Sequence, residues 1–154
     1  MRLSNIIKDR AILLAMQATD KQQALEEMVS FLKKNKILSN DKEVVEKLNQ
    51  REALGSTALG EGIAIPHCKV KNVKNPILLV GISSGGVDFS APDGKPVKVF
   101  FLLITSPEDP SLNLQILALI AQLVRKSPNL KDQILKATSA QDVLEVIKEL
   151  EEKA

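Results

Sequence analysis

The chain has 154 residues, of which 44% are hydrophobic and 26% charged, as is typical of one globular domain, so we expect a single domain over residues 1–154. Lysine and arginine number 21 against 19 acidic residues, and a net charge of +2 is too small for a dedicated nucleic-acid-binding protein. One cysteine and one histidine leave too few ligands for a disulfide or a zinc site, so we expect no metal and no cofactor.

The apolar and aromatic residues argue against a membrane-spanning protein, a secreted protein and a protein that stacks on nucleic-acid bases. The sequence has no apolar run near the ~20 residues that a membrane-spanning helix needs, and its N-terminus shows no signal-peptide pattern. It also has no Trp, no Tyr and only four Phe, which makes stacking on nucleic-acid bases improbable. We therefore expect a cytoplasmic protein that does not insert into a membrane itself.

The N-terminal part of the chain predicts a strand and two helices. Residues 11–16 are a weak candidate for a strand. Residues 20–35 have the apolar spacing of an amphipathic helix, and Asp20 can cap its first turn. A second helix is expected from residue 39 or 40 to residues 51–53, with its apolar residues directed inward.

Residues 55–68 differ from the segments on either side. Three glycines in eight residues are incompatible with a stable helix, and residues 63–65 form a short strand-like piece that Pro66 ends. The segment is therefore predicted to be a loop or sheet edge at the surface, where functional residues are often found.

The remaining residues predict strands followed by helices. Two continuous apolar runs, residues 77–82 and 97–104, are typical of central strands that are covered on both faces. One helix is expected around residues 112–124, and a shorter one begins at Ser127-Pro128 and ends at Ala137. Helices before and after the strands indicate an α/β fold, with a mixed sheet sandwiched between helices.

The last predicted helix begins at Ser139, which can cap it together with Asp142. Its apolar positions, 143, 146, 147 and 150, fall on one face. Residues 151–154 are expected to be a frayed tail, because they lie beyond the last of these apolar positions.

His67 is the only side chain of the sequence that changes charge near neutral pH, and glycines lie close before it. Arg51 could hold a phosphate through two parallel hydrogen bonds, and Ser56 and Thr57 offer hydroxyl and backbone N–H donors. Each residue also has an ordinary explanation: an incidental histidine, a solvated arginine at a helix end, and turn residues. Cys68 follows His67 on an extended segment, so the two side chains point apart and do not form a nucleophilic pair.

Residues 51–67, Arg-Glu-Ala-Leu-Gly-Ser-Thr-Ala-Leu-Gly-Glu-Gly-Ile-Ala-Ile-Pro-His, resemble a known signature. They are similar to the active-site signature of the fructose/mannitol-type (type 2) EIIA domains of the bacterial phosphoenolpyruvate-dependent phosphotransferase system. The resemblance extends over nearly the whole chain, through Asp-Gly-Lys-Pro before the strand at 97–104, the helix from Ser111 and the helix start at 137–142. It implies the same α/β sandwich.

The resemblance also implies an activity, that of a phosphotransferase component. His67 would accept a phosphoryl group from the phosphocarrier HPr, through Nε2, and pass it to a cysteine of an EIIB domain during uptake of a fructose- or mannitol-like sugar. Arg51 would steady the phosphate, and Thr57 stands where the family lines the pocket. Ser56 is expected to bind the phosphate through its own donors. Association with a membrane EIIC would then run through EIIB.

The sequence departs from the family pattern at two positions. Cys68 stands where glycine is usual, and its small side chain is expected to be tolerated. Asn113 aligns with a second histidine that many members carry at the start of a helix. Asparagine can donate a hydrogen bond to the phosphate or to His67 but carries no charge, and it could equally be an ordinary polar residue of the first turn. The transfer rate and the set of partners therefore stay open.

Three functions remain possible at this point. The first is the sugar phosphocarrier, which a fused or neighbouring EIIB or EIIC partner would favour. The second is a regulatory protein, because nitrogen-type EIIA proteins resemble the motif equally well and act by phosphorylation-dependent binding to other proteins. The third is a degenerate EIIA-like domain that no longer accepts phosphate.

Overall fold

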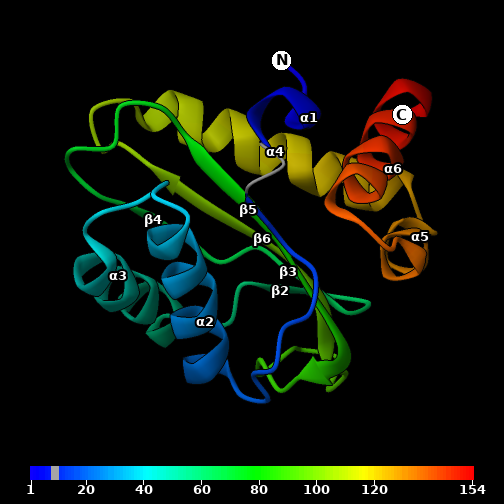
Figure 1. Ribbon diagram of the computed structural model, residues 1–154, viewed down its shortest axis with the longest axis horizontal. Helices are drawn as coiled ribbons and strands as arrows, with labels where there is room; N and C mark the ends of the chain where they lie inside the picture. Colours follow the sequence, from blue (N-terminus) through cyan, green and yellow to red (C-terminus); the bar gives the residue numbers. More distant parts are fainter. Residues whose placement is uncertain (8–10) are drawn as a thin grey trace.

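A mixed β-sheet runs through the middle of the computed structural model, which describes residues 1–7 and 11–154 (Figure 1). Within those residues six strands pair in the order β1-β5-β6-β3-β2, and β4 also pairs with β6. The strands are β1 (Ile12–Leu13), β2 (Ala58–Gly60), β3 (Ile63–Ala64), β4 (His67–Lys69), β5 (Ile77–Val87) and β6 (Val97–Thr105). The pairs β5–β6 and β2–β3 are antiparallel, whereas β1–β5, β3–β6 and β4–β6 are parallel.

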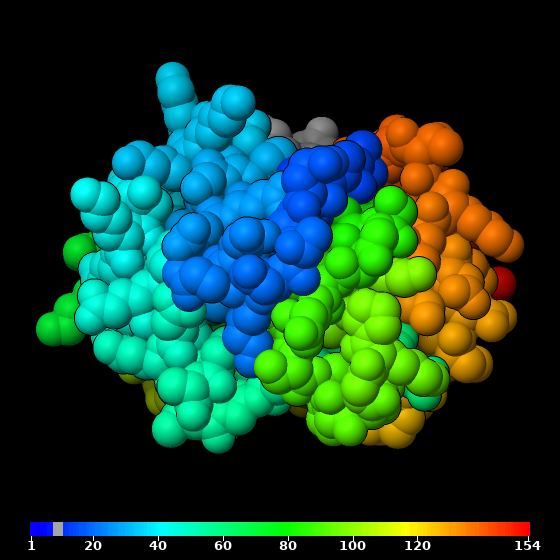
Figure 2. All heavy atoms as spheres, turned by 90° about the horizontal axis from the view of Figure 1, so that it is seen from below, coloured from blue at the N-terminus to red at the C-terminus, as the bar shows by residue number. Residues whose placement is uncertain are grey.

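Helices cover both faces of the sheet. One face packs on α2 (Lys21–Lys34) and α3 (Asp41–Ala53). The other packs on α1 (Leu3–Ile6), α4 (Pro110–Lys126), α5 (Leu130–Lys136) and α6 (Ala140–Lys153). Figure 2 shows the blue and cyan side chains of α2 and α3 separated from the orange ones of α5 and α6 by the green connection between β5 and β6. The predicted fold class is therefore confirmed.

The two long strands supply the centre of both cores. Phe100 and Leu102 of β6 face α2 and α3, whereas Phe101 and Leu103 face the other helical layer, and all four are fully buried. Burying a side chain of this kind stabilises the fold by about 1.5–3 kcal/mol. The prediction of central strands covered on both faces is confirmed.

Strand β5 is longer than its apolar run predicts. It continues through residues 83–86, which look like a turn in the sequence, to Val87. The pairing with β6 shifts register between Ile82 and Val87, and the Ser83 hydroxyl accepts a hydrogen bond from Gly86 N at 3.0 Å. An irregularity in the pairing therefore accommodates the small and polar residues without ending the strand.

Two predicted helix starts are confirmed by their capping bonds. The Asp20 carboxylate accepts a hydrogen bond from Gln23 N at 2.9 Å, at the start of α2. The Ser139 hydroxyl accepts one from Asp142 N at 3.1 Å, at the start of α6. Each bond satisfies an N–H group that has no partner inside its helix.

Two predictions near the C-terminus are wrong. Helix α5 begins at Leu130, after Asn129, because Ser127 and Pro128 belong to a turn in which Leu130 N donates to Ser127 O at 2.9 Å. The expected frayed tail is helical to Lys153. Its Glu151 carboxylate accepts hydrogen bonds from Leu3 N and from Ser4 N, so it caps α1, a helix that the sequence did not indicate. None of the described helices is long and apolar enough to cross a bilayer.

Candidate active site

The segment expected to be a loop or a sheet edge at the surface contributes three short strands to the sheet, β2, β3 and β4. Strands β3 and β4 lie one after the other along β6, with Ile63 opposite Val99 and His67 opposite Leu103. Pro66 interrupts them because it has no N–H group to donate to the ladder. The turn from β2 to β3 uses positive φ angles at Gly60 and Gly62, 93° and 81°, which glycine adopts without strain. His67 therefore stands on a rigid element, not on a loose loop.

The ring of His67 has a defined tautomer. Its Nδ1 lies 2.8 Å from the carbonyl oxygen of Ile65, and a carbonyl can only accept, so Nδ1 carries the proton. Nε2 is then left with its lone pair. Burial lowers the pKa of His67 below 6.5, the Ile65 bond opposes that shift, and the Arg51 charge lowers the pKa further. The ring is therefore neutral at pH 7, the form in which it is nucleophilic.

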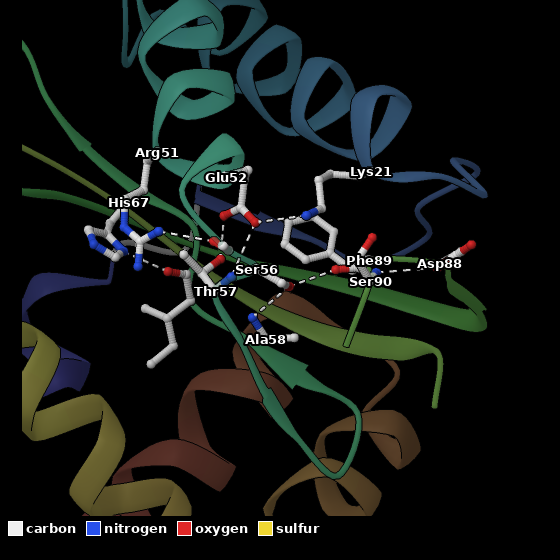
Figure 3. Close-up of polar contacts among 12 residues, drawn as sticks. Lys21, Arg51, Glu52, Ser56, Thr57, Ala58, His67, Asp88, Phe89 and Ser90 are labelled. Carbon is white, nitrogen blue, oxygen red and sulfur yellow. Dashed lines mark hydrogen bonds and ion pairs between the residues drawn. The ribbon is translucent and has the colours of Figure 1, made fainter. Parts of the chain in front are cut away.

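Arg51 lies in the last turn of α3, and its guanidinium lies beside the His67 ring (Figure 3). Its Nη1 donates a hydrogen bond to Gly55 O at 3.0 Å, which anchors the side chain over the turn that follows the helix. A guanidinium has five N–H donors in a planar fork, so this anchor leaves further donors for a bound anion.

Asn113 occupies the first turn of α4 and is 4% exposed. Its Oδ1 accepts a hydrogen bond from the Thr105 hydroxyl, at the end of β6, at 3.0 Å. That bond fixes the amide plane and leaves the NH₂ group to face a ligand. Asn113 and His67 line the same pocket, as the sequence predicts, but a direct bond between them stays a prediction.

An open pocket of about 350 Å³ surrounds the exposed part of His67. Its described lining consists of Lys47, Gln50, Arg51, Leu54, His67, Cys68, Lys69 and Asn113. Three of these side chains are cations and none is a carboxylate, so the pocket favours an anion. Sequence reasoning missed Lys47 and Gln50. Lys47 lies four residues before Arg51 in α3, a spacing that puts the two side chains on the same face of the helix, whereas Gln50 gives no such signal.

Ser56 and Thr57 were predicted to line this pocket, and the structure places their hydroxyls elsewhere. The Ser56 hydroxyl donates to Phe89 O at 2.7 Å and accepts from Ala58 N at 3.2 Å. Thr57 is buried, and its hydroxyl donates to the Glu52 carboxylate. The geometry therefore brings together His67, Arg51 and Asn113, and it leaves Ser56 and Thr57 outside the lining.

Among the described residues, no three His, Cys, Asp or Glu side chains lie together in a way that could hold a metal ion. The cysteine beside the site is buried, and burial raises the pKa of the Cys68 thiol to about 12. A thiol in that state is a poor nucleophile at neutral pH. What the site can offer chemically is one neutral imidazole, a guanidinium, two ammonium groups and two amides.

Comparison with known proteins gives a consistent family. The family model for the "phosphoenolpyruvate-dependent sugar phosphotransferase system, EIIA 2" matches residues 5–150. The chain is similar to the fructose-specific EIIABC component of Bacillus subtilis, at 30% identity over 147 residues, which are 96% of this chain and 23% of that protein. It is 29% identical over 147 residues to the nitrogen regulatory protein of Pseudomonas aeruginosa, covering 96% of this chain and 95% of that protein.

A solved structure supports the same grouping. The nitrogen regulatory protein IIA-Ntr from Neisseria meningitidis superimposes with a TM-score of 0.82 at 31% identity, covering 94% of this chain and 98% of that one. The chain thus spans about a quarter of the fructose-specific relative and nearly all of the nitrogen regulatory ones. Relatives named as fructose-specific and as nitrogen regulatory proteins are therefore about equally similar to it.

Proposed function

Because the chain belongs to the EIIA 2 family of the phosphoenolpyruvate-dependent sugar phosphotransferase system, we propose that it is a phosphocarrier that accepts a phosphoryl group from HPr on His67 and passes it to a cysteine of an EIIB domain. One observation carries the choice of atom. The bond from Nδ1 of His67 to Ile65 O leaves the Nε2 lone pair for attack. The cationic pocket around the ring suits the anion that is transferred.

In the first step the Nε2 lone pair attacks phosphorus. The bond from phosphorus to the donor breaks as the bond to Nε2 forms, and its electron pair returns to the donor. Negative charge is spread over three phosphoryl oxygens during this transfer. Arg51 and the ammonium groups of Lys47 and Lys69 lie around the pocket and are placed to stabilise that charge without a metal ion.

The second step follows from the same hydrogen bond. Because Nδ1 keeps its proton, attack through Nε2 makes the ring a phosphoimidazolium, and its positive charge strengthens the bond to Ile65 O. A cationic ring is a better leaving group than a neutral one. When the thiolate of the acceptor attacks phosphorus, the N–P electron pair returns to Nε2 and the neutral imidazole is restored.

The surface around the pocket suits a protein partner. Leu54, at the end of α3, lines the pocket and is 84% exposed. An exposed leucine beside the reactive ring suits a surface that a partner covers during transfer. We infer that donor and acceptor both dock here, because each must bring its own group to Nε2.

A second function is also supported, that of a regulatory protein of the nitrogen type. The chain covers nearly the full length of such relatives, and the IIA-Ntr structure matches it closely. Phosphorylation of His67 would then change the affinity of this surface for a regulated protein, and the phosphoryl group would not be passed on to a sugar permease.

The experiment that tests the proposal is reconstitution. The chain is incubated with phosphoenolpyruvate, enzyme I and HPr, and then with purified EIIB domains. Phosphate on His67 that moves to an EIIB cysteine supports the carrier. Phosphorylation of His67 without transfer to any EIIB domain favours the regulatory function. No phosphorylation of the chain at all contradicts both the carrier and the regulatory function. The His67→Gln variant is the control, since it removes the acceptor atom.

A further inference from the structure

We propose that Glu52 is a positioning residue for His67, whose buried carboxylate fixes the imidazole ring through Thr57 and Ile65 so that Nε2 faces the pocket. The role in transfer rests on the function proposed above, whereas the ring orientation is a property of the unphosphorylated chain. Neither Glu52 nor its partners lie in the pocket lining, so Glu52 would act on transfer only through other residues.

Glu52 is a buried acid with a partner from another helix. Its side chain is 3% exposed, and its Oε1 lies 3.2 Å from Lys21 Nζ of α2. The same ammonium lies 4.9 Å from the centre of the Phe89 ring. A buried carboxylate is retained without loss of stability only where charged and hydrogen-bonding partners surround it, and the fold supplies them here.

Both oxygens of Glu52 bind one residue of the segment that leads to the site. Oε1 accepts a hydrogen bond from Thr57 N at 3.1 Å, and Oε2 accepts one from the Thr57 hydroxyl (Figure 3). Two bonds from one residue to one rigid carboxylate fix its position and its orientation. Thr57 is therefore placed relative to α3 more firmly than a turn residue with a single bond.

The chain of hydrogen bonds continues from Thr57 to the reactive ring. Thr57 O accepts from Ile65 N at 3.1 Å, and Ile65 O accepts from His67 Nδ1 at 2.8 Å. Between Ile65 and His67 stands Pro66, whose ring fixes φ near −65° and keeps the two residues in a set relation. Displacement of Thr57 would therefore reach the atom that selects the tautomer of His67.

The neighbouring residue on α3 holds the other end of the same turn. Arg51 donates to Gly55 O at 3.0 Å, two residues before the segment held by Glu52. Adjacent side chains of one helix thus fix residues 55–57, and with them the placement of Arg51 relative to His67. The bond to Glu52 also accounts for the Thr57 hydroxyl, which is close to the site but does not line it.

The test compares four variants of the full chain. Glu52→Gln keeps the shape and removes the charge, and Thr57→Val removes the hydroxyl. Thr57→Ser keeps the hydroxyl and should rescue the chain of bonds. Asp41→Asn is the matched control, because Asp41 binds Lys33 at 3.1 Å and so also joins α3 to α2, but it has no such connection to His67.

The first measurement is the ¹⁵N chemical shift of both His67 ring nitrogens at pH 8, in the unphosphorylated protein. We expect Glu52→Gln and Thr57→Val to shift population from the Nδ1–H to the Nε2–H tautomer, while Thr57→Ser and Asp41→Asn match the parent. We also expect the first two to lower kcat for phosphoryl acceptance about tenfold or more with KM for HPr little changed, since misplacement of a reacting atom affects the chemical step.

Each outcome decides the proposal. Unchanged ring shifts in folded Glu52→Gln and Thr57→Val would overturn it, as would an equal change in Asp41→Asn, which would reflect general loosening of the helix pair. If Glu52→Gln does not fold, Thr57→Val decides alone. A chain that takes no phosphate would refute the proposed function, and the ring shifts would still test the role of Glu52.

Discussion

The substitution Arg51→Lys tests whether the proposed phosphate site needs only a positive charge at this position or also the planar geometry of a guanidinium. Arg51→Lys keeps a positive charge beside His67 but loses the planar fork that can hold two phosphoryl oxygens at once. Because Arg51 already uses Nη1 on Gly55 O, at 3.0 Å, the fork is pre-oriented over the pocket. A lysine ammonium on a flexible stem has no such anchor geometry, so at least one charged hydrogen bond to the in-flight phosphate is lost.

The expected magnitude follows from that loss. A hydrogen bond to a charged group contributes roughly 1.5–3 kcal/mol. Since each 1.36 kcal/mol is a factor of ten in rate, transfer to Arg51→Lys should slow by about 10- to 150-fold. The Arg51 bond to Gly55 is solvent-exposed, so the free energy of unfolding should fall by less than about 1 kcal/mol.

The assay is rapid-quench transfer from phosphorylated HPr, with thermal unfolding followed in parallel. Arg125→Lys is the matched control, because Arg125 is exposed in the last turn of α4 and is not among the described pocket residues. It should transfer at the parent rate. If Arg51→Lys also transferred at the parent rate, Arg51 would be a solvated arginine at a helix end, and the assignment of phosphate binding to it would be wrong.

Three further predictions concern the other groups of the pocket. Asn113→Ala should lower the free energy of unfolding by about 1–3 kcal/mol in chemical denaturation, because the buried Thr105 hydroxyl loses its acceptor. The same variant should shorten the lifetime of phosphorylated His67. Asn113→His should leave that lifetime at least as long as the parent's. The NMR titration midpoint of His67 should lie below 6.5, and Arg51→Gln should raise it. Since the unfolded chain then binds the proton more tightly, the His67 contribution to stability should be lost as pH falls from 6.5 through the folded pKa, a loss that His67→Gln abolishes. Alkylation of Cys68 at pH 8 should be slow until denaturant is added, because burial raises the thiol pKa to about 12, and rapid alkylation of the folded chain would contradict that burial.

Most of the fold could be predicted from periodicity and from capping residues. The continuous apolar runs identified β5 and β6 because a strand covered on both faces has no polar side, and Asp20 and Ser139 marked helix starts because a side-chain acceptor is needed there. The predictions failed where tertiary contacts decide. Glu151, in the last turns of α6, accepts hydrogen bonds from the first residues of α1, and no local sequence pattern records this contact between the two ends of the chain.

The residues that line the candidate site were predicted in part, and the prediction failed where buried tertiary contacts decide. Residue type made His67 and Arg51 candidates, the resemblance to the family gave them roles and added Asn113, and the three residues line one pocket. Thr57 was assigned to the pocket because it offers donors just after a helix end and stands where the family it resembles lines the pocket, but its partner is a carboxylate five residues earlier in the chain. The sequence contains Glu52 in the same signature. Its burial depends on tertiary packing, because Lys21 comes from α2, a different helix, and no local sequence pattern records that contact.

The central claim is that His67 carries the phosphoryl group on Nε2 while Nδ1 stays protonated. The most direct measurement is ³¹P–¹⁵N correlation on the ¹⁵N-labelled chain after incubation with phosphoenolpyruvate, enzyme I and HPr. We predict a single acid-labile phosphoramidate whose phosphorus couples to Nε2 of His67, with the Nδ1 proton still hydrogen-bonded to Ile65 O. Phosphorus on Nδ1, on another residue, or on no residue of the chain would contradict the account.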